Sequence, residues 1–354
     1  MKSKSIFLCG LLLAFAATSV NTSNSANAQD KLYRIKKNGK VSRTNGKIQE
    51  ITPLSVTFDG QKIPVWEISK LTAQNELPAV DKARDRIESS RYQEAIDLLE
   101  TVKPSGNPVT DAEVSWNRAV AKSELAFSGG AYTAVEAGSD VQAFLKANSK
   151  SYHFVPATDL MGRLAMADGK LSFAAKQFGT LTKSRWPKYV ARGHFYTGEA
   201  LLRAKKYPQA TAEFDKLIAL SSNDDVSQRY KRLARCQKAK VAAVTTDPAA
   251  SISQLEAIIK QGDPEDKELF AYAYNALGAC YMKGKDLAEA EEKFLFTHLL
   301  FDTESGPHAE AVYQLANIWT AQKQTDRASE ARQILNSRYR NTWWASQAAT
   351  AKAN

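Results

Sequence analysis

A spacing that recurs three times along the chain constrains its fold more than any other feature. A glycine lies in the middle of a helical stretch, an alanine follows twelve residues later, and a phenylalanine follows four residues after that. Closely crossing helices need small residues where their backbones approach, and a large ring one turn further on fills the gap to the next pair. Stacking buries the apolar face that a single pair leaves bare, so the spacing predicts a solenoid of helix hairpins. The three copies are Gly162, Ala174 and Phe178; Gly198, Ala210 and Phe214; and Gly278, Ala290 and Phe294.

Helical composition extends over residues 79–345. Glycine is sparse within segments, alanine, leucine, lysine and glutamate dominate, and the breaks fall at short polar stretches such as 221–224. Weaker copies of the spacing near Ala83 and Ala316, with two degenerate hairpins between the clear copies, indicate about seven hairpins of about 38 residues each. Residues 346–354 are predicted to form a flexible tail.

Residues 30–76 have the pattern of β-strands. Short alternating segments are separated by turn dipeptides, of which Asn45-Gly46 and Asp59-Gly60 are the clearest. These residues predict a small antiparallel β module. A module of this size has a thin core, so we expect it to rest on the helices that follow.

The first 28 residues have the pattern of an export signal. Lys2 and Lys4 precede an apolar run over residues 6–20, and Ala26-Asn27-Ala28 has the small-x-small form of a signal-peptidase site. The run is shorter than the roughly 18 to 20 residues that span a bilayer. We therefore expect a signal peptide over residues 1–28, cleavage before Gln29, and a mature protein in the periplasm or cell envelope.

The chain is basic, with a formal net charge of +10. Removal of the signal peptide takes away Lys2 and Lys4, so the mature chain stays basic. In an exported protein such a charge favours acidic proteins, anionic envelope polymers or acidic lipid head groups over nucleic acid as partners. Ordinary solubility explains the same charge equally well.

The repeated spacing resembles that of the tetratricopeptide repeat family, in which a small residue, an aromatic, an alanine and a second aromatic recur. The clearest copies are Tyr274, Leu277-Gly278, Tyr281, Ala290 and Phe294, and Gly198, Leu201, Tyr207, Ala210 and Phe214. With the export signal, the chain looks like the envelope proteins of this family in bacteria, although Arg340 replaces a proline common near their end. The resemblance implies a mainly α-helical superhelix preceded by the β module.

The resemblance also implies where a partner binds. In this family a protein or peptide segment lies in the concave groove, against particular positions on the first helix of each hairpin. Three of the groove positions, Lys231, Arg235 and Lys238, share one helix face, and that face serves either a partner or solvent. The implied groove residues are Arg192, Phe195, Arg203, Lys231, Arg235, Lys238, Tyr272, Asn275, Met282, Lys283, Tyr313 and Asn317.

No motif of an enzyme or metal site occurs in the sequence. Phosphate-binding, nucleophile-elbow, zinc-protease and dinucleotide motifs are missing, and the four histidines lack metal-ligand spacing. We therefore expect no catalysis, no cofactor and no metal. Cys236 and Cys280 are expected to be two buried thiols, although an oxidising compartment leaves a disulfide open.

Two functions follow from these observations. The first is a non-catalytic exported scaffold that binds a protein or peptide segment in the concave groove, with an acidic segment as one candidate. The alternative is an adaptor that holds an anionic envelope polymer or a membrane surface through its basic β module and basic helix. A salt titration separates the two, because contacts between exposed charges are screened. The oligomeric state is left open.

Overall fold

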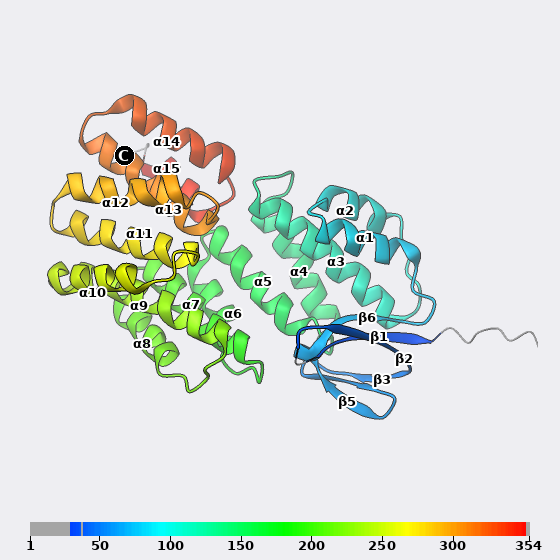
Figure 1. Ribbon diagram of the computed structural model, residues 1–354. Coiled ribbons are helices and arrows are strands. Elements are labelled where there is room, and N and C mark those ends of the chain that lie inside the picture. Colours follow the sequence, from blue (N-terminus) through cyan, green and yellow to red (C-terminus); the bar gives the residue numbers. More distant parts are fainter. Residues whose placement is uncertain (1–28, 37, 352–354) are drawn as a thin grey trace, which may run out of the picture.

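The computed structural model describes residues 29–36 and 38–351. The predicted signal peptide, residues 1–28, lies outside the described residues, as do the last three residues of the chain. The described chain is a small β module followed by an array of helices (Figure 1). No helix among the described residues is both long and apolar enough to cross a membrane.

The β module consists of two three-stranded antiparallel sheets, ordered β2-β1-β6 and β3-β4-β5. A short 3₁₀ helix, Val65–Glu67, precedes the last strand. The apolar core of the module includes Tyr152 from the helical region, and Trp66 packs against Trp186 at 6.4 Å between ring centroids. The module therefore rests on the helices, as its thin core requires. The strands are β1 (Asp30–Ile35), β2 (Val41–Gly46), β3 (Ile48–Ile51), β4 (Ser55–Phe58), β5 (Gln61–Pro64) and β6 (Ile68–Thr72).

The two turn dipeptides have different fates. Asp59-Gly60 forms the predicted tight turn: both residues have positive φ, and Phe58 pairs with Gln61 across it. The turn predicted at Asn45-Gly46 is wrong, because both residues lie within β2. Glycine is needed at position 46 for another reason, since a Cβ there would overlap the Asp59 carboxylate.

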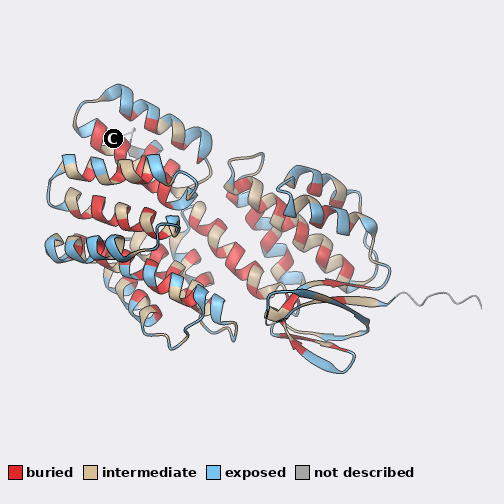
Figure 2. Cartoon of the chain, viewed as in Figure 1, coloured by how far each residue is buried: buried red, intermediate tan, exposed pale blue. Residues whose placement is uncertain are grey.

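The helical region comprises seven helix pairs and one further helix within the described residues, and this confirms the mainly helical fold class. Figure 2 shows more buried positions on first helices such as α5 than on second helices such as α10 and α14. The helices are α1 (Pro78–Glu88), α2 (Tyr92–Glu100), α3 (Pro108–Phe127), α4 (Ala134–Ala147), α5 (Phe154–Ala167), α6 (Leu171–Leu181), α7 (Pro187–Arg203), α8 (Tyr207–Ile218), α9 (Asp225–Thr245), α10 (Pro248–Gln261), α11 (Lys267–Lys283), α12 (Leu287–Leu300), α13 (Ser305–Ala321), α14 (Thr325–Arg338) and α15 (Trp343–Ala351).

The repeated glycines lie against the repeated phenylalanines of the same helix pair. A Cβ on Gly162 would lie 2.7 Å from the Phe178 ring, and one on Gly278 would lie 2.6 Å from the Phe294 ring. Gly198 makes the same close approach to its phenylalanine. All three rings are fully buried, as are Ala174, Ala210 and Ala290. The spacing thus marks the crossing point inside each pair. The rings also reach the next pair, as expected: Phe178 stacks on Tyr196 of α7 at 5.2 Å between ring centroids, and Phe294 shares an apolar core with Val312 of α13.

The predicted flexible tail over residues 346–354 is wrong for the part that the structure describes. Helix α15 continues through residue 351 and packs on α13 and α14. Trp344, Ala345 and Ala348 are buried. The apolar face of α15 is too short for the composition of the sequence to reveal it. The face is buried because it packs against α13 and α14.

The end of the array returns to its beginning. The Asn341 side chain donates hydrogen bonds to the carbonyl oxygens of Ala126, at 3.0 Å, and Tyr132, at 2.9 Å. The Arg340 guanidinium donates to the carbonyl of Gly130. These acceptors lie at the α3–α4 connection, beside the end of α14 (Figure 1). The superhelix is therefore closed by contacts between residues about two hundred positions apart.

A buried chain of polar groups lies close to this closure. His298 Nδ1 and His308 Nε2 are 2.8 Å apart, and His308 Nδ1 lies 2.5 Å from the Tyr339 hydroxyl. Burial, together with repulsion from His298 and Arg338, lowers the pKa of His308 to about 4, against a weaker opposing effect of Asp302. The pKa of His298 is also lowered, chiefly by burial.

We expect the protein to lose stability on mild acidification. An unfolded histidine has a pKa of about 6.5 and takes up a proton first, so stability falls as the pH drops from about 6.5 towards 4. The loss attributable to His308 amounts to about 3 kcal/mol. Thermal melts at pH 7 and 4.5 test this, with His308→Gln showing a smaller decrease. The control is His194→Gln. His194 bonds Glu213 within the α7–α8 pair, which is not the pair that holds His308. Equal pH dependence in both variants would contradict the assignment.

Candidate functional site

The inner side of the helical array holds a cavity of about 590 Å³. Its walls come from the first helices of four successive pairs, α7, α9, α11 and α13, with contributions from α8 and α15. This placement follows from the repeat, because the first helix of each pair faces the inside of the curve. We call this space the inner cavity.

The wall contributed by α7, α9 and α13 is polar and internally paired. Arg203 Nη2 lies 3.2 Å from Glu199 Oε2, and Lys240 forms an ion pair with Glu310. Burial raises the pKa of Glu199, while Arg203 and Lys240 oppose that shift. These four charges satisfy one another, so they shape the cavity and leave little capacity for a ligand.

Another part of the cavity wall is aromatic. Tyr313 and Trp344 pack with ring centroids 5.4 Å apart, and Trp343 lies 4.5 Å from Trp344. The Arg203 guanidinium lies 5.2 Å from the Trp344 ring centroid and 5.7 Å from that of Trp343. Large, rigid aromatic surfaces of this kind contribute much of the binding energy at protein interfaces.

Lys205 and Lys283 also line the inner cavity. Neither lysine forms an ion pair with a carboxylate of the described residues. Their charges are therefore available to a ligand, unlike those of Lys240 and Arg203.

Five of the twelve predicted groove residues line the inner cavity, and their role in binding remains a prediction. They come from three first helices, and they supply both cationic and aromatic groups to the walls. They are Arg203, Met282, Lys283, Tyr313 and Asn317.

Four further predicted groove residues lie in the core or pack between helices. Phe195 is fully buried, and its ring packs against Tyr272 at 5.7 Å between centroids. Asn275 is buried and donates to the carbonyl of Pro307 at 2.8 Å. Arg192 bonds Asp159 Oδ1 at 2.6 Å and the Tyr230 hydroxyl at 3.0 Å. None of these four residues lines the inner cavity, because successive first helices are in contact there and these side chains pack between them.

The predicted basic face of α9 does not exist as a single surface. Lys231 is buried and donates to the carbonyls of Leu220 and Ser222. Lys238 pairs with Asp215 of α8 at 2.5 Å. Arg235 is exposed beside residues of α10 and lines no part of the inner cavity. The three side chains therefore point to different neighbours.

The reason is a register error of two residues. Lys231, Arg235 and Lys238 are groove positions only if Ala234 is the counterpart of Gly278, whereas the lining of the inner cavity makes Cys236 the counterpart. Lys240, four residues after Cys236, lines the inner cavity as Met282 does four residues after Gly278. Cys236 and Cys280 are buried free thiols, as expected, and burial raises their pKa values to about 12 and about 11.

Sequence reasoning missed several cavity residues. Lys240 was missed because of the register error in α9. Glu310 was missed because a charged residue reads as solvent-exposed in sequence, although it forms an ion pair with Lys240. No local signal in the sequence places Trp343 and Trp344 beside Arg203. Their adjacency is the one feature that could have marked them, because paired tryptophans seldom stay exposed.

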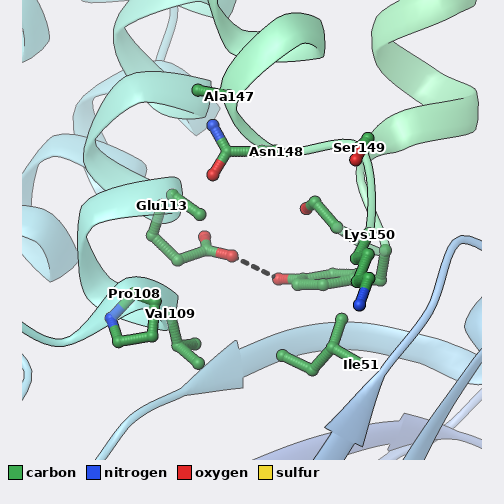
Figure 3. Close-up of a pocket in the computed structure, with 11 residues that line it drawn as sticks. Ile51, Pro108, Val109, Glu113, Ala147, Asn148, Ser149 and Lys150 are labelled. Atoms are coloured by element: carbon green, nitrogen blue, oxygen red, sulfur yellow. Dashed lines mark hydrogen bonds between the residues drawn. The ribbon is translucent and has the colours of Figure 1, made fainter.

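A second cavity, of about 330 Å³, lies where the β module meets α3 and the α4–α5 connection (Figure 3). Glu113 lies deep in it and accepts hydrogen bonds from the Tyr152 hydroxyl at 2.7 Å, His153 Nε2 at 2.8 Å and Arg84 Nη2 at 2.8 Å. Burial alone would raise the pKa of Glu113, but His153 and Arg84 hold it at about 2. The carboxylate is fully used within the protein, so it is not a ligand site. The network ties α1 and α3 to the segment before α5, whose Tyr152 ring belongs to the core of the β module.

The fold and the inner cavity define a class of protein: a helical-repeat array with a cavity on its inner side. Residues 160–225 and 236–295 match the family model of the tetratricopeptide repeat. These two stretches therefore match tetratricopeptide repeats, and proteins built from such repeats are typically non-catalytic and generally bind proteins or peptides.

Solved structures share the fold. A tetratricopeptide repeat protein from Parabacteroides merdae is 16% identical with a TM-score of 0.53, over 78% of this chain and 98% of that chain. A Rap protein complexed with Competence and Sporulation Factor is 14% identical with a TM-score of 0.50, over 75% of this chain and 76% of that chain. At these identities the similarity shows the fold alone. No curated protein matches this chain.

Proposed function

We propose that this protein is a non-catalytic scaffold that binds a protein or peptide segment in the inner cavity. The observation that carries the proposal is the cavity itself, where an aromatic wall lies beside two lysines without carboxylate partners among the described residues. The Rap protein, which shares the fold, is complexed with a factor, and this supports a binding role for such an array. Aromatic burial supplies affinity, and charge-assisted contacts supply specificity.

The partner segment is acidic under this proposal. Arg203, Lys205, Lys240 and Lys283 line the inner cavity against two carboxylates, Glu199 and Glu310. The excess of positive charge lies at Lys205 and Lys283, where a carboxylate of the partner forms the missing ion pairs. Complementary charge also speeds encounter and rejects basic competitors.

We also propose that the protein acts after export, in the periplasm or cell envelope. The support is the N-terminal sequence, with its two lysines, short apolar run and small-x-small site. The first strand, β1, begins at Asp30, two residues after the proposed cleavage position. N-terminal sequencing of the envelope-located protein tests this, and an intact Met1 would overturn it.

One observation favours the alternative function, binding of an anionic polymer or membrane surface. Lys36, Lys40, Arg43 and Lys47 are exposed on the β module. The second support for this alternative is lost, because the basic residues of α9 do not share a surface. Alternating exposed lysines are also typical of a solvated strand face. The inner cavity is therefore the better candidate.

We expect Lys283→Glu to reduce capture of the partner at least about ten-fold, because like charges across an interface cost several kcal/mol. The measurement is crosslinking of the full chain in an envelope fraction, followed by quantification of the recovered protein. Lys285→Glu is the matched control, since Lys285 is exposed two residues away and lines no part of the inner cavity. Equal recovery with both variants would overturn the site. Recovery of polymer alone, lost on adding salt, would support the alternative.

A further inference from the structure

We propose that α15, which forms part of the wall of the inner cavity, is held there as an intramolecular ligand, and that the partner is a short acidic segment with adjacent aromatic side chains that displaces it. This inference rests on the proposed function, because it specifies the chemistry of the segment that the same cavity accepts. It also gives α15 a role beyond that of covering the last helix pair.

The contacts of α15 extend far beyond its own neighbours. A helix that only covers α13 and α14 has no reason to touch α7, which lies three pairs earlier. Yet Trp343 and Trp344 both lie against the Arg203 guanidinium of α7. A Cβ on Gly169, in the α5–α6 turn, would lie 3.4 Å from Trp343 Cδ1. The two tryptophans therefore connect the last helix pair to α7 and to the α5–α6 turn.

The tryptophan pair occupies the best aromatic position in the cavity. Trp344 is buried between Tyr313 and Arg203, with centroid distances of 5.4 Å and 5.2 Å. Stacking between a guanidinium and an indole is favourable, and more so when it is removed from water. Aromatic side chains of a partner gain the same contacts once α15 leaves.

The fit of α15 is nevertheless incomplete. The Trp344 indole nitrogen is buried and has no hydrogen-bond partner in the described part of the chain, an arrangement that costs about 1 to 3 kcal/mol. The described sequence of α15 contains no acidic residue, while Lys205 and Lys283 lack carboxylate partners there. A partner segment that accepts a hydrogen bond from Lys283, and that has no buried donor without an acceptor, binds the cavity more tightly than α15 does. Such a segment can therefore displace α15.

The chain before α15 is anchored independently. The Asn341 amide holds the carbonyls of Ala126 and Tyr132, and the Thr342 hydroxyl bonds the carbonyl of Tyr339 at 2.8 Å and accepts from the Ala345 amide. Displacement of α15 therefore needs a change only after Asn341, while the closure of the superhelix stays in place. The hinge falls at residue 342.

The test uses α15 itself as the probe. A dye-labelled peptide with the sequence of residues 342–351 is titrated against the full chain and against the full chain carrying Trp343→Ala and Trp344→Ala, with binding followed by fluorescence anisotropy. We expect the double variant to bind the peptide at least about ten-fold more tightly than the unaltered chain, in which α15 already makes the contacts that the peptide would make. A folded double variant, judged by circular dichroism, that binds no more tightly would overturn the proposal.

The acidic component has its own matched control. Gln347 lines the inner cavity, whereas Ser346 is exposed on the other face of α15. We expect a peptide carrying Gln347→Glu to bind the double variant at least about three-fold more tightly than the original peptide, and one carrying Ser346→Glu to bind equally. No difference between the two peptides would overturn the acidic component.

A second measurement tests the proposal even if the double variant does not fold. In the full chain with Arg203→Ala, we expect backbone hydrogens of residues 343–351 to exchange at least about ten-fold faster, with α14 unchanged. Arg327→Ala, which removes the cation over Trp319, is the control. Unchanged exchange in α15 would overturn the proposal. Neither experiment involves an external partner, so failure of envelope capture with Lys283→Glu would overturn the proposed function while leaving occupation by α15 intact.

Discussion

Replacing Glu113 with alanine is expected to lower the free energy of unfolding by about 3 to 5 kcal/mol, the range for breaking a buried charge network from one side. The Glu113 carboxylate is 4% exposed. Its loss leaves the buried Tyr152 hydroxyl and the His153 ring without their acceptor. Arg84 keeps Glu76 and Asp81 but loses Glu113. The measurement is equilibrium unfolding in urea.

Two comparisons make this prediction specific. Glu113→Gln keeps the shape and one acceptor, so we expect a smaller loss than for alanine. Glu94→Ala removes a carboxylate from an ion pair with Arg91 on the exposed side of α2, and we expect an unchanged melting temperature. If Glu113→Ala has the same melting temperature as Glu94→Ala, the Glu113 network does not stabilise the packing of α1 and α3 against the segment before α5.

The contrast between local and long-range features explains what the sequence could predict. The relation of Gly278 to Phe294 lies within one hairpin, so its spacing is visible in a single chain and the fold class follows from it. The Asp59-Gly60 turn is local in the same way. The contact of Asn341 with Ala126 joins residues 215 positions apart. No periodicity encodes such a contact, and the closure was therefore missed.

The candidate site lies between these extremes. Met282 and Lys283 were placed correctly because Gly278 fixes the register of α11. In α9 the counterpart of Gly278 is Cys236. The nearby Ala234 is smaller and is preceded by a leucine, as Gly278 is, so the sequence favours a register that is wrong by two residues. Buried ion pairs mislead in the same manner, since Lys240 and Glu310 look solvated in sequence although they pair within the cavity wall.

A polar network such as that of Glu113 is hidden for a related reason. Its members come from α1, α3 and the segment before α5, separated by 29 to 40 residues. Each looks like an ordinary surface residue in its own helix. Only packing shows that they meet, and burial then turns ordinary charges into a structural requirement.

The second large effect is expected at the crossing point of a helix pair. Gly278→Leu should destabilise the protein by about 3 kcal/mol or more, the upper part of the range for overpacking. Even the first carbon of the new side chain would lie 2.6 Å from the Phe294 ring, which is fully buried and cannot move aside freely. Equilibrium unfolding of the variant against the unaltered chain measures the effect.

A matched pair of alanine variants separates packing from helix propensity. Alanine is favoured over glycine within a helix by about 1 kcal/mol. Gly179 lies within α6, and a Cβ added there would meet nothing within 4 Å, so Gly179→Ala should raise the melting temperature. Gly278→Ala should lower it, because contact with the Phe294 ring outweighs the gain in propensity. The two changes are chemically identical, and their opposite signs would follow from the crossing geometry alone. If both variants gain stability, the helices do not approach at Gly278 as closely as the repeat requires.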